Sequence, residues 1–196
     1  MLLAAALLTA CSPPEPPQLK QGTLLPFAKA VSDFQLSDHK EQPFTLENLK
    51  GTWSFAFFGY THCPDVCPTS LAMLAQVMKK LEKNDTLNTL PQVVFVSVDP
   101  ERDTPELLEK YLPYFHPDFI GLTGDPQQIL VLTRQLGILY GKAPGDNADD
   151  YLVDHSAAII LFDPDGNFRA LFGVPHDPGL IAQEFVAIKN YYEATR

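Results

Sequence analysis

Short apolar runs alternate with amphipathic segments along the chain from about residue 31 onward. The run Trp53–Phe58 (WSFAFF) is uninterrupted and lies between Gly51 and Gly59, which predicts a buried central strand. Val93–Val98 predicts a second buried strand for the same reason. Shorter strands are expected at Phe34–Leu36, Phe44–Leu46, Phe119–Leu122, Ser156–Phe162 and Phe168–Phe172, the last two on either side of a turn signal at Asp163–Asn167.

The segments between these strands carry helical patterns. Leu71, Leu74 and Met78 recur at the spacing of one helix face, and Pro68 suits a first turn because its fixed φ is already helical. The pattern predicts a helix from about Pro68 to Lys83. Further helices are expected from Thr104, as the N-cap, to about Phe115, over Pro126–Leu136, and from about Pro178 to Tyr192.

This alternation predicts an α/β fold, with a mixed sheet and helices on both of its faces. No internal repeat or second linker interrupts the pattern, so residues 31–196 are expected to form one domain. Residues 142–150 (KAPGDNADD) are poor in apolar side chains and are expected to form an acidic loop. In sheets of this class, functional groups gather at the carboxyl ends of strands, where the loop Gly59–Cys67 lies.

The amino-terminal segment carries targeting signals. Residues 1–10 are apolar but too few to cross a membrane, which needs about 20, and they resemble a secretory signal peptide. Leu8–Cys11 resembles a bacterial lipobox, in which Cys11 becomes the lipidated first residue. Residues 11–30 include the proline-rich run Ser12–Pro17, which favours an extended tether. We therefore expect a domain that is lipid-anchored in the bacterial cell envelope, on the exported side. The alternative is a hydrophobic tail without a role in export.

The composition narrows the classes of function. Apolar residues make up 45% of the 196 residues, which is enough for a packed core and excludes a mainly disordered chain. Lys and Arg number 14 against 24 Asp and Glu, a formal charge of −10, and such a surface repels nucleic acid. With Cys11 placed in the tether, only Cys63 and Cys67 belong to the domain, and an exported compartment allows them to form a disulfide.

The strongest chemical signal is the run Cys63-Pro64-Asp65-Val66-Cys67-Pro68, between the central strand and the first helix. Side chains four positions apart share a helix face, and a separation of about 6 Å suits a disulfide or two thiolates on one metal ion. The helix N-terminus is expected to favour thiolate over thiol. Redox chemistry and soft-metal ligation therefore both remain open. A purely structural disulfide is disfavoured, because closing so small a loop removes little chain entropy.

A metal ion would need a third ligand, and the chain offers five histidines. His155 lies just ahead of the strand expected at residues 156–162, and in a thioredoxin-like sheet the stretch entering this strand passes beside the redox loop. Two thiolates with one imidazole suit copper, and Cu(I) in particular. His62 is expected to point away from Cys63, where it would tune the thiolate or meet a partner. The other three histidines are expected to be solvated: His39, His116 and His176.

Acidic side chains follow the second central strand in the loop Asp99–Pro105. Turn and helix-cap chemistry is one explanation for this loop. The alternative is that Asp99 and Asp103 lie next to the metal ligands and help to orient them, or that the loop binds a partner. The same alternatives apply to Asp154, which precedes His155.

Three segments together resemble the Sco/SenC family of thioredoxin-like copper proteins. They are Gly59–Leu71, Ser97–Pro105 and Asp154–Ser156, and the resemblance extends over roughly residues 31–192. The combination is specific, whereas Cys-x-x-x-Cys-Pro alone would be a weak signal.

This resemblance implies a thioredoxin-like fold, with Cys63, Cys67 and His155 as copper ligands. It also implies a role in building the dinuclear copper site of cytochrome c oxidase subunit II. Two mechanisms are associated with the family, which are delivery of copper and reduction of the target's cysteines. Its members are typically tethered to a membrane on the exported side.

Three other functions compete with this one. Ordinary thioredoxins place two residues between their cysteines where this chain has three, and His155 occupies the region of their substrate-clamping proline. A peroxiredoxin wants Thr three residues before its reactive cysteine, but Pro64 precedes Cys67 and Tyr60 precedes Cys63 at that spacing. A redox sensor without metal would use the same dithiol and stays open. The pattern favours metal binding over enzymatic turnover.

Overall fold

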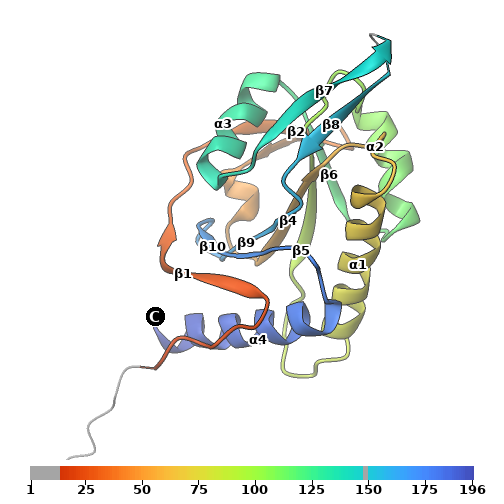
Figure 1. Cartoon of the computed structure of the whole chain (residues 1–196). Helices are drawn as coiled ribbons and strands as arrows, with labels where there is room; N and C mark the ends of the chain where they lie inside the picture. The colour runs from red at the N-terminus through yellow and green to blue at the C-terminus, as the bar shows by residue number, and fades with distance from the viewer. Residues whose placement is uncertain (1–13, 148–149) are drawn as a thin grey trace, which may run out of the picture.

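One mixed sheet forms the centre of the computed structural model, which describes residues 14–147 and 150–196 (Figure 1). Its strands are β1 (Gly22–Lys29), β2 (Gln35–Asp38), β3 (Pro43–Thr45), β4 (Ser54–Gly59), β5 (Gln92–Ser97), β6 (Ile120–Thr123), β9 (Ile159–Phe162) and β10 (Phe168–Phe172). Their order across the sheet is β1-β10-β9-β4-β5-β6-β2-β3. The central strands β4, β5 and β6 are parallel to one another, whereas β9 and β2 pair antiparallel to β4 and β6. The predicted mixed sheet is therefore confirmed.

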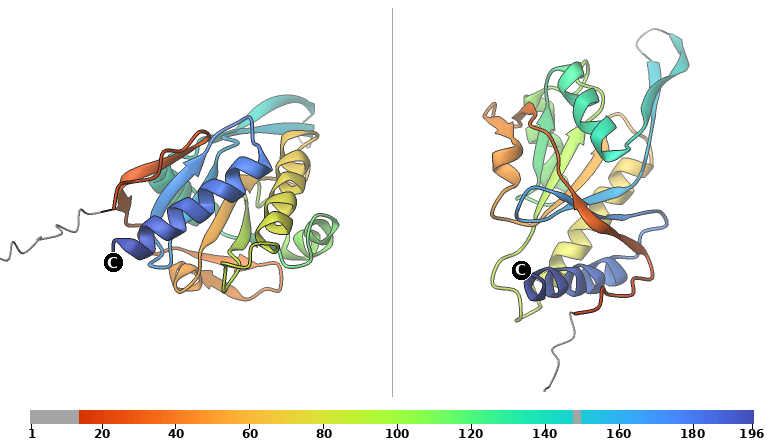
Figure 2. Two further views of the ribbon diagram at one scale, coloured as in Figure 1. Left: turned by 90° about the horizontal axis from the view of Figure 1, so that it is seen from below. Right: turned by 90° about the vertical axis from the view of Figure 1, so that its left-hand side faces the viewer.

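Helices cover both faces of this sheet, as predicted (Figure 2). They are α1 (Val66–Leu81), α2 (Pro105–Tyr111), α3 (Pro126–Leu136) and α4 (Pro178–Ala194), with short 3₁₀ turns η1 (Leu46–Leu49) and η2 (Leu112–Tyr114). On one face, Phe55 of β4 packs against Phe185 of α4, and Phe95 of β5 packs against Tyr111 of α2. On the other face, Phe58 of β4 and Leu132 of α3 line the same small space. Because β4 and β5 are buried on both faces, their central residues, 55–58 and 93–96, are all apolar.

Three of the helices begin with the same device, an oxygen-bearing cap followed by proline. The side chain of Thr104 accepts a hydrogen bond from the N–H of Leu107 at the start of α2. Asp125 and Asp177 cap α3 and α4 in the same way, each accepting two backbone N–H groups. These caps satisfy donors that the helix itself leaves unpaired, and the prolines fit where no donor is needed.

A separate hairpin of two strands, β7 (Tyr140–Asn147) and β8 (Asp150–His155), projects from the top of the molecule in Figure 1. The expectation of an acidic loop over residues 142–150 is therefore wrong. Along β8, the exposed Leu152 and Asp154 alternate with the buried Val153. A hairpin with only one buried face needs few apolar residues. For this reason the composition of residues 142–150 resembled that of a loop.

The first strand, β1, lies inside the segment 11–30 that was expected to be a tether. It pairs antiparallel with β10 at the edge of the sheet, so the domain begins before residue 31. The carboxylate of Glu184, on α4, accepts hydrogen bonds from the backbone N–H groups of Lys20, Gln21 and Gly22 at 2.6–3.0 Å. The segment that leads into β1 is thus fixed to α4, near the carboxyl terminus of the chain. The proposed signal peptide and Cys11 lie outside the described residues.

Replacing Glu184 by alanine is expected to loosen the start of β1. The change leaves three backbone donors without their shared acceptor, and hydrogen bonds to a charged group contribute about 1.5–3 kcal/mol each. Because water can reach part of this site, we expect the free energy of unfolding to fall by about 2–3 kcal/mol. Hydrogen exchange should then rise at the amides of residues 20–24. Unchanged exchange there would contradict this role of Glu184.

Candidate metal centre

The dithiol lies at the carboxyl end of β4, where the chain turns into α1. The turn is closed by a hydrogen bond from the N–H of Cys63 to the carbonyl oxygen of Tyr60. Since α1 begins at Val66, Cys63 precedes the helix and does not share a helix face with Cys67 as was expected. The N–H of Cys67 donates a hydrogen bond to Cys63 Sγ at 3.4 Å, so Cys63 is still held next to the first turn of α1. Both cysteines are free thiols, Cys67 buried and Cys63 half-buried.

The absence of a side chain at Gly59 makes room for the buried sulfur. A Cβ atom at this position would lie 2.6 Å from Cys67 Sγ and 3.0 Å from the ring of Phe95. Both distances are shorter than van der Waals contact allows. The last residue of β4 therefore allows α1 to approach the sheet closely enough to place Cys67 at the strand end.

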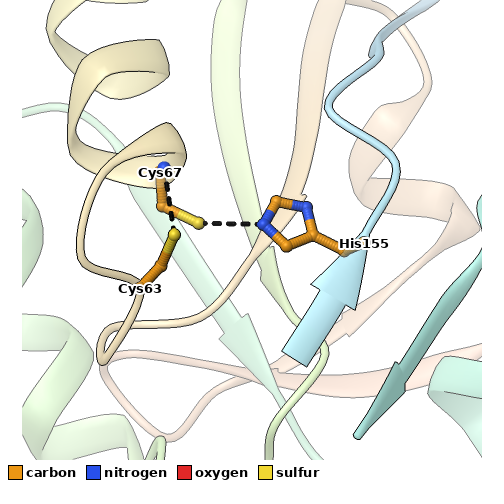
Figure 3. Close-up of side chains that lie close together, drawn as sticks. All are labelled: Cys63, Cys67 and His155. Carbon is orange, nitrogen blue, oxygen red and sulfur yellow. Dashed lines mark hydrogen bonds between the residues drawn. The ribbon is translucent and has the colours of Figure 1, made fainter. Parts of the chain in front are cut away.

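His155, the last residue of β8, reaches the dithiol from the other side (Figure 3). Its Nε2 lies 3.2 Å from Cys67 Sγ, and the two sulfurs and an imidazole nitrogen all lie within 4.8 Å of one another. The expected convergence of His155 on the dithiol is confirmed. The segments joined in this way are 88 residues apart in the chain.

The contacts of the His155 ring identify the nitrogen that is available. Its Nδ1 lies 3.3 Å from the carbonyl oxygen of Ser156, which can only accept, so Nδ1 carries the proton. Burial lowers the pKa of His155, which favours the neutral ring. Nε2 therefore presents its lone pair to the sulfurs, in the state that a metal ligand requires.

The buried thiol behaves differently from the expectation for a helix N-terminus. Burial, followed by the hydrogen bond and charge of Cys63, raises the pKa of the Cys67 thiol above its ordinary value. Removal of Cys67 from water outweighs the backbone hydrogen bond at Tyr60, which lowers this pKa. Cys67 is thus held as a thiol that can donate to His155 Nε2, and a metal ion that binds there must displace its proton.

The donor set fits a soft metal ion held by three ligands. With bonds of about 2.0–2.3 Å, three ligands around one ion stand about 3.5–4 Å apart, which is close to the separations in this group. Two sulfurs and one imidazole nitrogen suit copper. Within the described residues, this is the one group of three or more His, Cys, Asp or Glu side chains with such spacing.

Aromatic rings enclose the imidazole. Phe57 and Tyr60 meet the His155 ring edge-on, each at 6.0 Å between ring centroids. Both aromatic side chains are almost completely buried. They restrict rotation of the imidazole and keep water from one side of the site, which lowers the reorganisation that a bound ion would require.

Asp103 and His62, both candidates from the sequence, lie outside the group formed by Cys63, Cys67 and His155. The carboxylate of Asp103 is fully buried and accepts hydrogen bonds from the N–H and Oγ1 of Thr61 and from Ser97 Oγ, at 2.6–3.0 Å. Burial raises the pKa of Asp103. The His62 ring is exposed, with Nδ1 at 3.1 Å from Thr61 Oγ1. Asp103 therefore braces the loop that precedes Cys63.

The other acidic candidates divide between the interior and the surface. Asp99 is buried and bonds Arg102 and Tyr151, whereas Asp154 is exposed on the outer face of β8. Neither the need for a missing side chain at Gly59 nor the role of Tyr151 was predicted from the sequence. The alternation along β8 was the available signal for Tyr151, since it shares a face with His155.

The three histidines that were expected to be solvated are half-buried instead. His39 Nδ1 accepts a hydrogen bond from the N–H of Gly121 at 3.0 Å, and the ring of His116 stacks on Phe119. Burial lowers the pKa of His176. Each ring thus bonds to or packs against another part of the chain, which a turn position in the sequence does not reveal.

Fold and site together define a thioredoxin-like protein with two cysteines and a histidine gathered at the carboxyl edge of its sheet. The model of the SCO1/SenC family matches residues 23–190, and the chain therefore belongs to this family. The mitochondrial protein SCO2 homolog of Mus musculus is 44% identical over 146 residues, which are 74% of this chain and 57% of that protein. The SCO2-like protein of Rickettsia felis is 41% identical over 151 residues, covering 76% of this chain and 72% of the relative.

Solved structures give the same picture. Arabidopsis thaliana ScoI with copper bound has 38% identity and a TM-score of 0.77, covering 83% of this chain and 99% of that one. Bradyrhizobium japonicum ScoI with copper bound has 39% identity and a TM-score of 0.71, with the same coverage. This chain thus spans nearly the whole of both solved domains, but little more than half of the mouse relative.

Proposed function

We propose that this protein binds copper through Cys63, Cys67 and His155. The observation that carries the proposal is the gathering of two sulfurs and one imidazole nitrogen within 4.8 Å at the strand end. The copper-bound family structures support it, and so does the neutral state of the imidazole. Soft sulfur donors favour Cu(I), and proton loss from the thiols makes its affinity depend on pH.

We further propose that copper is cargo for the dinuclear copper site of cytochrome c oxidase subunit II. Membership of the family supports this role. Cys63 and Cys67 could also reduce a disulfide between the target's cysteines by thiol–disulfide exchange. In that step the dithiol gives two electrons and two protons to the target, and a Cys63–Cys67 disulfide forms. The same oxidation removes both sulfur donors from copper, so transfer of metal and of electrons would be coupled at one site.

For the location, we propose that residues 1–10 direct export and that Cys11 carries a lipid anchor, with the proline-rich segment holding the domain off the membrane of the bacterial cell envelope. The lipobox-like run Leu8–Cys11 supports this assignment. Among the described residues, none of the helices has both the length and the apolar character needed to cross a membrane.

A second candidate is an exported thiol–disulfide oxidoreductase or redox sensor that uses the same cysteines. The half-buried Cys63, whose sulfur accepts a helix N–H, is the feature that favours it. Against rapid turnover stands the raised pKa of Cys67, because a buried thiol is a poor partner for disulfide exchange. We therefore propose binding of copper ahead of enzymatic activity.

Replacing His155 by alanine tests the three-ligand site. We expect the affinity for Cu(I) to fall by about 100-fold, the order of one ligand's share of the binding free energy in structural metal sites. The dissociation constant would be measured by competition with a chromogenic Cu(I) chelator. His62→Ala is the matched control, because the exposed His62 ring lies outside the ligand group. An affinity that is unchanged in His155→Ala would rule out the proposed ligand set.

Electron paramagnetic resonance of the Cu(II)-loaded protein gives an independent check of the donor atoms. Sulfur ligation and nitrogen coupling from one imidazole are expected for the unmodified protein. Loss of the nitrogen coupling is expected in His155→Ala. A spectrum with oxygen donors alone in the unmodified protein would contradict the proposed site.

A further inference from the structure

His155 reaches the dithiol from a hairpin that is not part of the main sheet. Within the described residues, β7 and β8 pair with each other and make no backbone ladder with the eight-stranded sheet. The base of the hairpin is held by a hydrogen bond from the N–H of Ser156 to the carbonyl oxygen of Leu139. Further along β8, its position depends on contacts between side chains.

The inner face of β8 supplies these contacts. Side chains alternate along a strand, so Tyr151 and Val153 lie on the same face as His155, whereas Leu152 and Asp154 face outward. Val153 is buried, and both Leu152 and Asp154 are exposed. Tyr151 thus lies on the ligand's face, about 13 Å from His155 along an extended strand.

Tyr151 is bound to the loop that follows β5. Its hydroxyl donates a hydrogen bond to Asp99 Oδ1 at 2.7 Å. Arg102 Nε donates to the other carboxylate oxygen of Asp99 at 2.5 Å, and the Arg102 guanidinium lies 3.7 Å from the centroid of the Tyr151 ring. Asp99 is only 2% exposed. A buried carboxylate therefore joins the hairpin and the loop, and a cation covers the tyrosine ring.

A weaker contact joins the other strand of the hairpin to the same loop. Lys142, on β7, forms an ion pair with Glu101 at 2.6 Å, and its Nζ lies 4.4 Å from the centroid of the Tyr151 ring. Both partners of this pair are largely exposed, so it contributes little by itself. The contact between hairpin and loop that involves a buried group is the hydrogen bond between Tyr151 and Asp99.

Arg102 also links the contact between Tyr151 and Asp99 to the candidate metal centre. Its guanidinium lies 5.7 Å from the centroid of the Tyr60 ring, and Tyr60 in turn meets His155 edge-on. The order of contact is therefore Asp99, Arg102, Tyr60 and His155. Displacement of Arg102 would change the packing of the ring that limits rotation of the imidazole.

We propose that Tyr151, Arg102 and Asp99 form a clamp that holds strand β8 against the loop after β5 and so positions His155 over the two sulfurs. The clamp rests on the proposed function, because it acts through the proposed copper ligand. None of its members belongs to the ligand group, and all three are positioning residues. The affinity of the site for copper therefore depends on contacts made one strand-length away from the ion.

Replacing Tyr151 by phenylalanine tests the clamp while keeping the ring that Arg102 covers. In the copper-free protein, hydrogen exchange at the β8 amides from Leu152 to His155 is expected to rise by about tenfold, the size of one hydrogen bond to a charged group. The dissociation constant for Cu(I) is expected to rise by a similar factor. Tyr140→Phe is the matched control, because Tyr140 lies in the same hairpin opposite His155, and its hydroxyl makes no hydrogen bond within the described part of the chain.

The same substitution in a His155→Ala background separates positioning from general destabilisation. If Tyr151 acts through His155, the double variant binds Cu(I) as His155→Ala does, with no further loss. A further tenfold loss in the double variant would overturn the proposal, as would exchange or affinity in Tyr151→Phe that equals the wild type. If His155→Ala itself leaves copper affinity unchanged, the ligand set fails, and the exchange measurement still decides whether Tyr151 holds the hairpin.

Arg102→Lys provides a second variant. It keeps the positive charge beside Asp99 but loses the planar group that covers Tyr151. Faster exchange in β8 is expected here too, with a thermal unfolding curve that remains a single transition. Exchange at the wild-type rate in either Tyr151→Phe or Arg102→Lys would show that the hairpin does not depend on the clamp.

Discussion

Replacing Cys67 by serine is expected to abolish tight binding of Cu(I). In structural metal sites, apparent binding free energies of about 10–16 kcal/mol are shared among four ligands, or about 3–4 kcal/mol for each. Loss of one ligand thus costs about 10²–10³ in affinity. A buried thiolate replaced by a neutral hydroxyl should reach at least the upper end of this range. Competition with a chromogenic chelator would measure the loss.

The same variant should lose reversible disulfide formation, since one sulfur is gone. Cys11→Ser is the control, because Cys11 is proposed to carry lipid and not copper; its affinity should equal that of the unmodified protein. Tight Cu(I) binding retained by Cys67→Ser would contradict both the ligand set and the proposed coupling between metal release and oxidation of the dithiol.

Replacing Gly59 by alanine is expected to disturb the centre without changing any ligand. The added methyl group would lie 2.6 Å from Cys67 Sγ and 3.0 Å from Phe95, so the sulfur, the ring or the start of α1 must move. Forcing an extra carbon into a packed core typically costs about 1–3 kcal/mol. We expect the free energy of unfolding to fall by about that amount in urea titrations, and the affinity for Cu(I) to fall by at least tenfold.

Gly173→Ala is the matched control for this change. A Cβ atom at Gly173 would meet nothing within 4 Å, so stability and copper affinity should both stay near their original values. A Gly59→Ala protein as stable as the unmodified one, with the same affinity, would show that the contact between β4 and Cys67 is not as close as described.

The parts of the site that could be predicted from the sequence are those with local signals. The spacing of Cys63 and Cys67 between an apolar run and a helical stripe placed the dithiol at a strand end, and the structure places it there. His155 could be proposed because it lies four residues before the apolar strand β9, which lies beside β4. The order of these strands in the sheet follows from a common topology, so their proximity could be anticipated.

Other features depended on contacts between distant segments and left no local signal. β1 shows no clear alternation, because it is an edge strand with a bulge, and its start is held by Glu184 more than 160 residues away. The sequence showed that the loop after β5 is rich in acidic residues. It did not show which of their carboxylates bonds to the hairpin and which bonds to Thr61. That division depends on the fold of β7 and β8, whose polar composition resembled a loop.

The unequal exposure of the two sulfurs also gives the centre a direction. Cys67 has no surface in contact with solvent, whereas Cys63 is half-buried. An incoming donor group from another molecule can therefore reach the centre on the side of Cys63 and of His155, which is also half-buried, but not on the side of Cys67. In the proposed copper complex, exchange of the ion would begin at one of these two outer donors, and the buried sulfur of Cys67 would release the ion last.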